Sequence, residues 1–313
     1  MIRFIIRRLV SGVVLLFVIS VIAYGLLYLS GGDIARRILG QNATQDVVDR
    51  KTVELGLDRP LIVQYVDWFV NAIQGDFGRS WFTGQLVTEG ITARLAVTLT
   101  IVVGATLLAA LVSVAVGVLA AVRGGWVDRI VQVGSILGFA VPGFLIALAL
   151  VLVFSIALGW FKATGYIPIT TSVSGWLSSV TLPVVALAIG TTAAVAQQVR
   201  GSVVDALQRD YVRTLRSRGL GMGRVVGKHV LRNAGGPALA VLAVQFVGLL
   251  SGAVIVEQVF ALPGIGQLAV SATAAGDIPI VMGIVIVTAI IAVLVNLVID
   301  LAQAALNPKV RLS

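Results

Sequence analysis

One stretch of the chain, from Arg209 to Asn233, gathers basic side chains and glycines within a sequence that is otherwise mostly apolar. Glycine backbones beside a lysine are the parts from which phosphate-binding loops are built, so the stretch first raises the question of nucleotide chemistry. Its basic residues are Arg209, Arg213, Arg216, Arg218, Arg224, Lys228 and Arg232, and its glycines include Gly219, Gly221, Gly223 and Gly227.

A phosphate-binding loop is not what these residues form. The pattern G-x-x-x-x-G-K-[ST] needs a glycine where this chain has Met222 and a hydroxyl where it has His229, and no hydrophobic strand precedes it. The glycines before Met222 begin a G-x-G pattern that does not continue as G-x-G-x-x-G. We therefore expect this chain to bind no nucleotide and to hydrolyse no ATP.

The sequence also offers few residues for metal binding or nucleophilic catalysis. His229 is the only histidine, and the chain has no cysteine, which excludes thiolate ligands, disulfides and cysteine nucleophiles. No cluster of His, Asp and Glu indicates a metal, and one histidine in a basic loop is expected to be structural. The sequence thus predicts neither catalytic residues nor a directly bound cofactor.

The spacing of the charges predicts an amphipathic helix that ends near Gly219, a typical helix-stop residue. Residues at i, i+4, i+8 and i+11 share one face of a helix. Such a helix could lie on an inner leaflet, form a solvated loop that orients its neighbours, or dock a partner protein, and composition leaves all three open. The charged face comprises Asp205, Arg209, Arg213 and Arg216, and the opposite face comprises Val203, Leu207, Tyr211 and Leu215.

The elements around this stretch must cross a membrane. Of the 313 residues, 58% are hydrophobic and only 12% are charged, against about 25% charged in soluble domains. Several uncharged runs reach the roughly 20 residues that span a bilayer as a helix. The net charge of +9 follows from basic residues at the ends of spans rather than from nucleic-acid binding. The predicted spans are Leu9–Leu29, Leu95–Val122, Ile130–Leu158, Val180–Val199, Pro237–Val256 and Ile280–Ala304.

The sequence therefore predicts an all-α membrane protein with six transmembrane helices and both termini in the cytoplasm. With this orientation the inner regions carry 15 of the 23 lysines and arginines, as the positive-inside rule requires. The predicted parts are a first helix (1–30), an external soluble segment (31–94), a five-helix core (95–305) with a cytoplasmic loop (200–234), and a cytoplasmic tail (306–313).

The external segment contains one predicted short helix. Apolar residues recur at helical spacing from Leu61 to Ile73 after a turn that ends in Pro60, and we expect this helix to pack on the external mouth. Two further polar stretches, Lys162–Ser179 and Glu257–Pro279, are predicted as loops.

Polar residues within spans are costly in lipid and face a cavity or another helix. Gln245 and Ser251 are the favoured candidates to line a pathway, with Glu257 at the start of the outer turn as a third, although a helix–helix hydrogen bond is the commoner role of such residues. Pro142 could act as a hinge or as a static kink. Further candidates are Gln197, Gln198, Asn296 and Asp300.

The order of residues in the basic stretch resembles a known family. DYVRTLRSRGLGMGRVVGKHVLRNAGGP is similar to the cytoplasmic loop of permease subunits of ATP-binding cassette (ABC) importers, in the dipeptide/oligopeptide/nickel form. Leu215 and Arg218 stand where the family usually has alanine and lysine, Lys228 replaces an arginine, and Gly235–Gly236 replaces an apolar pair. Three further segments, GLDRPLIVQYVDWFVNAIQGDFGRSWFTG, EQVFALPGIGQL and NLVIDLAQAALNPKVR, also resemble the family.

This resemblance implies a permease in the bacterial inner membrane that forms a heterodimer with a second homologous permease. Two cytoplasmic ABC ATPases, which bind ATP and Mg, would drive the pair, and an external solute-binding protein or lipoprotein would deliver the cargo. The pathway would lie between the two permeases. A coupling helix would sit in a groove of the ATPase. On this reading the ATPase-coupling residues are Arg209, Asp210, Tyr211, Arg213, Thr214, Arg216, Arg218, Gly219 and Leu220.

The resemblance favours dipeptides and short oligopeptides as cargo and leaves nickel chelates, glutathione and haem as alternatives. Two other classes of function are less well supported by the residues. A stand-alone channel or ion-coupled transporter would need charges within its spans, and the first five have essentially none. An intramembrane enzyme would need paired carboxylates or a serine/histidine set in its spans.

Overall fold

The computed structural model describes residues 2–30 and 34–306. The predicted tail beyond residue 306, with Lys309 and Arg311, lies outside the described residues, as do residues 31–33 at the start of the predicted external segment. Every named element in the described part of the chain is a helix, and an isolated bridge between Arg79 and Leu86 accompanies them. The predicted all-α class is therefore confirmed.

The helices group into two compact units. The larger unit is formed mainly by residues 97–262, and the smaller by residues 6–96 and 263–293. The smaller unit contains most of α1 (Ile2–Ser30), together with α2 (Ile34–Leu39), α3 (Gln45–Glu54), α4 (Leu61–Ile73) and α12 (Ile265–Ala275). Two long helices, α5 (Val87–Arg123) and α13 (Ile278–Leu306), contribute residues to both units.

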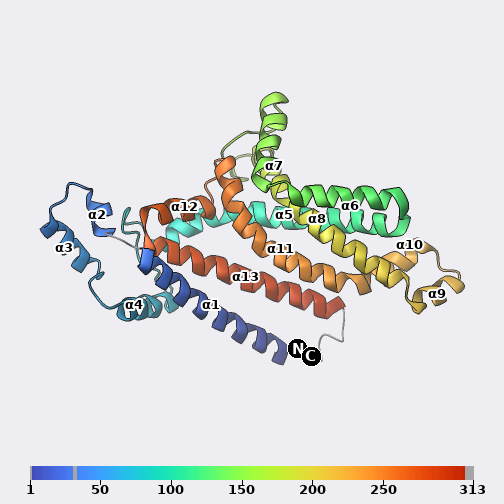
Figure 1. Cartoon of the computed structure of the whole chain (residues 1–313), viewed down its shortest axis with the longest axis horizontal. Coiled ribbons are helices and arrows are strands. Elements are labelled where there is room, and N and C mark those ends of the chain that lie inside the picture. The colour runs from blue at the N-terminus through green and yellow to red at the C-terminus, as the bar shows by residue number, and fades with distance from the viewer. Residues whose placement is uncertain (1, 31–33, 307–313) are drawn as a thin grey trace. The chain divides into compact units, whose positions relative to one another are not determined.

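The larger unit is built around α8 (Val173–Leu207), which packs against both α11 (Leu231–Val259) and α6 (Gly125–Ala140) (Figure 1). A core of buried valines joins α8 to the short segments that precede α11. The remaining elements of this unit are α7 (Gly143–Leu150), the π-helical η1 (Val151–Ala157), α9 (Asp210–Ser217), α10 (Met222–Arg224) and the π-helical η2 (Val225–Val230).

Five helices are long and apolar enough to cross a membrane, and α6 with α7 and η1 makes a sixth if that bent pair is one span. The bend between the two members of the pair is 97° and falls at Val141 and Pro142. Proline has no N–H to donate and its ring clashes with the preceding turn, so α6 ends before it. Pro142, for which a hinge and a static kink were both predicted, thus stands at a break between two helices.

Several predicted boundaries are wrong in the same direction, because the helices are longer than the uncharged runs. The second long helix begins at Val87 rather than Leu95, so the predicted external segment ends in helix. The predicted loop before the fourth span is helical from Val173 onward, and α6 begins at Gly125 rather than Ile130. Helices continue past the apolar region wherever polar side chains reach water or a partner, and hydropathy does not register this continuation.

Glycine allows α5 and α8 to approach closely, as small residues do between membrane helices. A Cβ atom built on Gly117 would lie 2.8 Å from the carbonyl oxygen of Ala196 and 2.9 Å from the side chain of Val199. Gly104 has a similar relation to Val184, at 3.0 Å. Backbone closes the space at Gly117, so even alanine does not fit there.

We predict that Gly117→Ala lowers the thermal stability of the detergent-solubilised protein. Overpacking a tight contact costs about 1–3 kcal/mol, and here the opposing atom is a main-chain oxygen that cannot rotate away. The matched control is Gly134→Ala in α6, where a Cβ would meet no atom within 4 Å. Equal unfolding midpoints for the two variants would show that α5 and α8 do not pack as closely as described.

Candidate functional site

The predicted coupling segment is a separate short helix rather than the end of a long one. The helix α8 ends at Leu207, Arg209 has extended backbone with φ −75° and ψ 147°, and α9 begins at Asp210. The predicted continuous helix from Val203 to Leu220 is therefore wrong. Asp210 favours a new helix because a carboxylate in the first turn complements the helix dipole, and a break here lets α9 change direction.

The predicted end of this helix at Gly219 is confirmed. Gly219 has φ +82°, and its N–H donates to the carbonyl of Arg216 at 2.9 Å. The N–H of Leu220 donates to the carbonyl of Leu215 at 3.2 Å. This pair of hydrogen bonds is the Schellman arrangement, which favours glycine because it needs a left-handed residue.

The predicted apolar face packs inward as expected. Val203 is fully buried, and Leu207, Tyr211 and Leu215 pack against the buried core that α8 shares with η2 and α11. The hydroxyl of Tyr211 also accepts a hydrogen bond from the side-chain amide of Asn233, at 3.2 Å. These contacts attach α9 to the start of the long helix α11.

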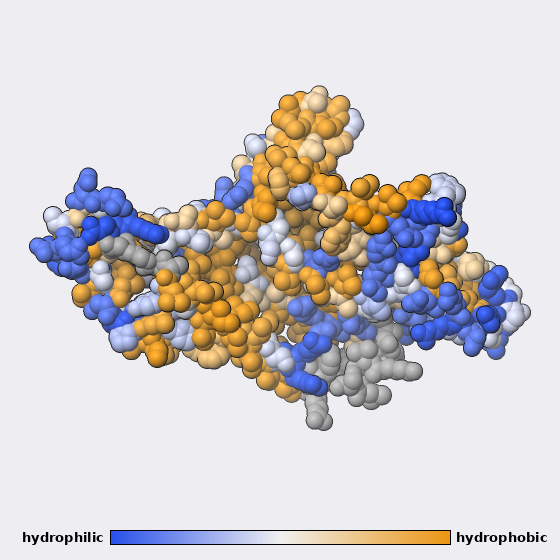
Figure 2. Space-filling view, in the orientation of Figure 1, coloured by the Kyte–Doolittle hydropathy of each residue, from blue (hydrophilic) through white to orange (hydrophobic). Residues whose placement is uncertain are grey.

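The opposite face of α9 is exposed and basic, and Figure 2 shows it as a hydrophilic surface over α9 and the adjoining turn. The side chains of Asp210 and Arg213 are 98% and 82% exposed, and their charged atoms are 4.0 Å apart. Of the nine predicted coupling residues, only Tyr211 and Leu220 point into the core. The exposed members are Arg209, Asp210, Arg213, Thr214, Arg216, Arg218 and Gly219.

An ion pair links α8 to α6, and the sequence did not predict it. The guanidinium of Arg200 donates two hydrogen bonds to the carboxylate of Asp128, one of them 2.6 Å long. Gln132 donates a third to the same carboxylate, at 2.9 Å. A bidentate, partly buried pair is a directional link, but its partners are 72 residues apart in sequence. Only the tertiary contact of α6 with α8 reveals it.

A cavity of about 460 Å³ lies next to α9. Asp205 of α8, Arg209 of the link between α8 and α9, and Tyr211 of α9 line it together with Asn233 and Pro237 of α11. Because its walls come from the helices that α9 joins, its shape depends on how α9 sits against α8 and α11.

A cavity of about 440 Å³ lies where α6 breaks into α7, and α8 and α11 complete its walls. Pro142 and Gln245, which were predicted separately as a hinge and as a pathway residue, both line it. Thr191 supplies a further polar group, and most of the remaining lining is apolar or glycine. No charged side chain contributes to this lining, so the cavity suits an uncharged or apolar group rather than an ion.

The other two favoured pathway residues do not reach this cavity. Ser251 is exposed on α11 and is absent from the cavity lining. Glu257 does not begin an outer turn as predicted, because α11 continues to Val259 and α12 occupies part of the predicted loop. The carboxyl group of Glu257 is fully buried and accepts a hydrogen bond from Thr98 of α5 at 2.5 Å. Its burial indicates a role in fastening α11 to α5.

The remaining polar candidates for a pathway role lie on α8 and α13. Gln198 donates to Ser202 one turn later in α8, at 3.1 Å, so its side chain bonds within its own helix and not to another of the described helices. Gln197 and Asp300 are half-buried, and Asn296 is exposed. No group of His, Cys, Asp or Glu that could hold a metal ion occurs within residues 2–30 and 34–306.

Two family models match the chain along almost its whole length. The model described as "Binding-protein-dependent transport system inner membrane component" matches residues 113–312, and its N-terminal companion matches residues 1–102. Among curated proteins, the chain is 36% identical over 308 residues to a putative peptide transport system permease protein of Brucella abortus, covering 98% of each chain.

Other relatives are equally close. A probable peptide ABC transporter permease of Sinorhizobium fredii is 38% identical, covering 98% of this chain and 99% of the relative. The glutathione transport system permease protein GsiC of Escherichia coli is 35% identical, covering 99% of both. Among solved structures, a chain of the inward-facing MetNI methionine ABC transporter matches 67% of this chain and 93% of its own length, with a TM-score of 0.54 and 17% identity. This last match supports the fold alone.

Proposed function

Because the chain belongs to the family of inner-membrane components of binding-protein-dependent transport systems, we propose that it forms half of the pathway of an importer for dipeptides and short oligopeptides. The chain is an ABC importer permease, a transport component rather than an enzyme, and a multi-pass protein of the bacterial inner membrane. Peptide cargo is the finer step, and relatives named as peptide permeases at 36–38% identity support it.

Peptide and glutathione transport call for similar chemistry, since glutathione is itself a short peptide. The uncharged cavity at the break of α6 carries the proposal furthest, because it brings one amide side chain, Gln245, to a largely apolar space of about 440 Å³. Such a space accommodates a variable apolar side chain while the amide and Thr191 orient polar groups of the cargo. A nickel chelate or haem would place more demand on charged or metal-ligating groups, and the lining supplies none.

The proposed assembly rests on the family to which the chain belongs, whose transport systems depend on a binding protein. The chain pairs with a second homologous permease to close the pathway, receives cargo from an external solute-binding protein, and takes energy from two cytoplasmic ATPases that bind ATP and Mg. Both termini and α9 face the cytoplasm in this arrangement, as the excess of basic residues near them favours. The exposed arginines of α9 then meet acidic groups of an ATPase, which sets register and encounter rate.

Uptake by the reconstituted transporter tests the proposed function. The chain is co-reconstituted with its second permease and ATPases in vesicles, the binding protein is added outside, and uptake of radiolabelled dipeptides, oligopeptides and glutathione is compared with ATP inside. We expect ATP-dependent accumulation of dipeptides and none when the ATPases are omitted. Accumulation of glutathione without any dipeptide or oligopeptide would refute the proposed dipeptide and oligopeptide cargo. Uphill transport by this chain alone would refute the proposed dependence on partners.

A further inference from the structure

The short helix α4 (Leu61–Ile73) has apolar side chains on two faces, and only one of these faces is covered. The uncovered side chains stand at i, i+4, i+8 and i+11, so they form one stripe along the helix. Their exposed fractions are 75% for Ile62, 48% for Val66, 48% for Val70 and 70% for Ile73. We call these four residues the α4 stripe; a row of large aliphatic side chains in water would be costly.

The covered face of α4 packs on the membrane-spanning helix α1, beside which it lies in Figure 1. The hydroxyl groups of Tyr65 and Ser20 form a hydrogen bond of 2.8 Å. The ring of Tyr65 meets that of Tyr24 edge-on at 5.5 Å, and the ring of Phe69 meets that of Phe17 edge-on at 5.6 Å. These contacts fix where α4 lies along α1.

The contact with Phe17 places α4 within the depth of the bilayer. The apolar span of α1 runs from Ile5 to Leu29, so Phe17 is near its middle. At 1.5 Å per residue it lies about 18 Å along the helix axis from Leu29, whereas the hydrocarbon core is about 30 Å thick. A helix whose Phe69 touches Phe17 cannot therefore rest wholly outside the hydrocarbon region.

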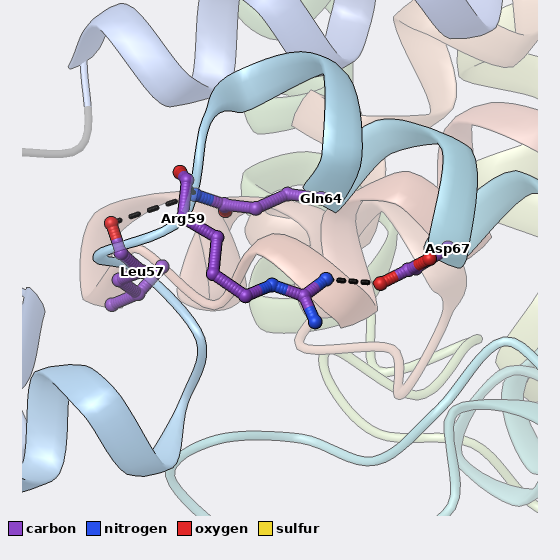
Figure 3. A network of polar contacts seen from close by, with 4 residues as sticks. All are labelled: Leu57, Arg59, Gln64 and Asp67. Carbon is purple, nitrogen blue, oxygen red and sulfur yellow. Dashed lines mark hydrogen bonds and ion pairs between the residues drawn. The ribbon is translucent and has the colours of Figure 1, made fainter.

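The polar residues of α4 are confined to the arc away from the α4 stripe. Gln64, Asp67 and Asn71 follow one another at i, i+3 and i+7 on one face. Figure 3 shows the side-chain amide of Gln64 donating to the carbonyl groups of Leu57 and Arg59, at 3.5 and 2.7 Å. The charge of Asp67 is paired with Arg59. The single charged side chain of the helix is thus paired outside the α4 stripe.

We propose that α4 is embedded in the bilayer beside α1 and that the α4 stripe contacts lipid acyl chains. The stripe is continuous with the lipid-facing surface of α1, because Phe69 lies next to Ile62 around α4 and its ring touches the half-exposed Phe17. All backbone groups inside a helix are satisfied internally, which a lipid environment demands. The part of the chain after α1 is then not a soluble segment alone, since it returns into the membrane before α5 begins.

Nitroxide labelling tests this placement, and the absence of cysteine makes each label unique in the chain. Val66→Cys and Val70→Cys are labelled in the full-length chain in phosphatidylcholine vesicles, with and without the second permease. Collision rates with oxygen, which concentrates in lipid, are compared with those of a water-soluble nickel chelate. The matched references are Val13→Cys on α1, which is 65% exposed, and Val53→Cys on the polar helix α3, which is 62% exposed.

The proposal expects the two stripe labels to resemble the Val13 reference, with at least several-fold more oxygen than nickel collisions relative to the Val53 reference. A nickel collision rate equal to that at position 53 would place α4 in water and overturn it. Low rates with both reagents in the presence of the second permease would also overturn it, because they would show that protein covers the stripe.

Discussion

Replacing Arg213 and Arg216 with glutamate is expected to reduce ATP-dependent uptake to background while leaving the protein folded in the membrane. Both side chains project from the exposed face of α9, and Arg213 is 82% exposed. In the proposed docking of α9 on acidic groups of an ATPase, charge reversal turns attraction into repulsion, which costs several kcal/mol. Since 1.4 kcal/mol is a factor of ten, docking to the ATPase should weaken about 100-fold or more.

The two arginines can be changed without disturbing the core, because the inward contacts of α9 come from Tyr211, Val212 and Leu215. The measurements are peptide uptake by vesicles, copurification of the ATPases with the permease, and the unfolding midpoint. The matched control is Arg213→Lys with Arg216→Lys, which keeps both charges and should retain most of the docking. Undiminished uptake by the glutamate variant would contradict the coupling role of α9, whereas loss of membrane insertion would show that the residues are structural.

The features that local sequence determines were predicted most closely. The helix from Leu61 to Ile73 has the predicted bounds, because Pro60 sets its start and the apolar spacing inside it is regular. The stop at Gly219 and the inward face of Val203 and Tyr211 were likewise predicted. In each case the residues that determine the feature are close together in sequence, so it could be predicted without knowledge of tertiary contacts.

The break between α8 and α9 escaped prediction for a physical reason. Both helices direct their apolar residues to one core, so the 3.6-residue pattern of Val203, Leu207, Tyr211 and Leu215 runs on through the break. Periodicity reports which face is buried and does not report a change of axis between two short segments. Only the start signal of Asp210 marks the new helix.

Two lining residues of the cavity at the break of α6 were candidates from the sequence, but the cavity itself was not predicted. Gln245 and Pro142 were selected for different reasons, and the fold brings them to one cavity. Glu257 was assigned to a turn because the apolar run ends there, yet a hydrogen bond from Thr98 allows its carboxyl group to be buried inside α11. Pairing partners 159 residues apart leave no local trace, and the same is true of Arg200 with Asp128.

A large side chain placed on α11 so that it fills the cavity at the break of α6 is expected to reduce uptake strongly. Gly248 lines the cavity, and a Cβ built there would meet only the side-chain oxygen of Gln245, at 3.8 Å. A Cβ at this position therefore meets no backbone of another helix, and the ring of Gly248→Phe is directed at a cavity of about 440 Å³. If cargo must displace that ring at a cost of about 1–3 kcal/mol, uptake should fall roughly 5- to 150-fold.

The neighbouring substitution Val247→Phe is the matched control, since Val247 is 41% exposed on the same helix and does not line the cavity. Initial rates of dipeptide uptake should drop for Gly248→Phe alone, while ATPase copurification and the unfolding midpoint stay equal in the two variants. The loss should be greater for peptides with bulky apolar side chains than for glycine-rich ones, because bulky groups compete with the ring for the same volume. Equal uptake by both variants would mean that cargo does not enter this cavity.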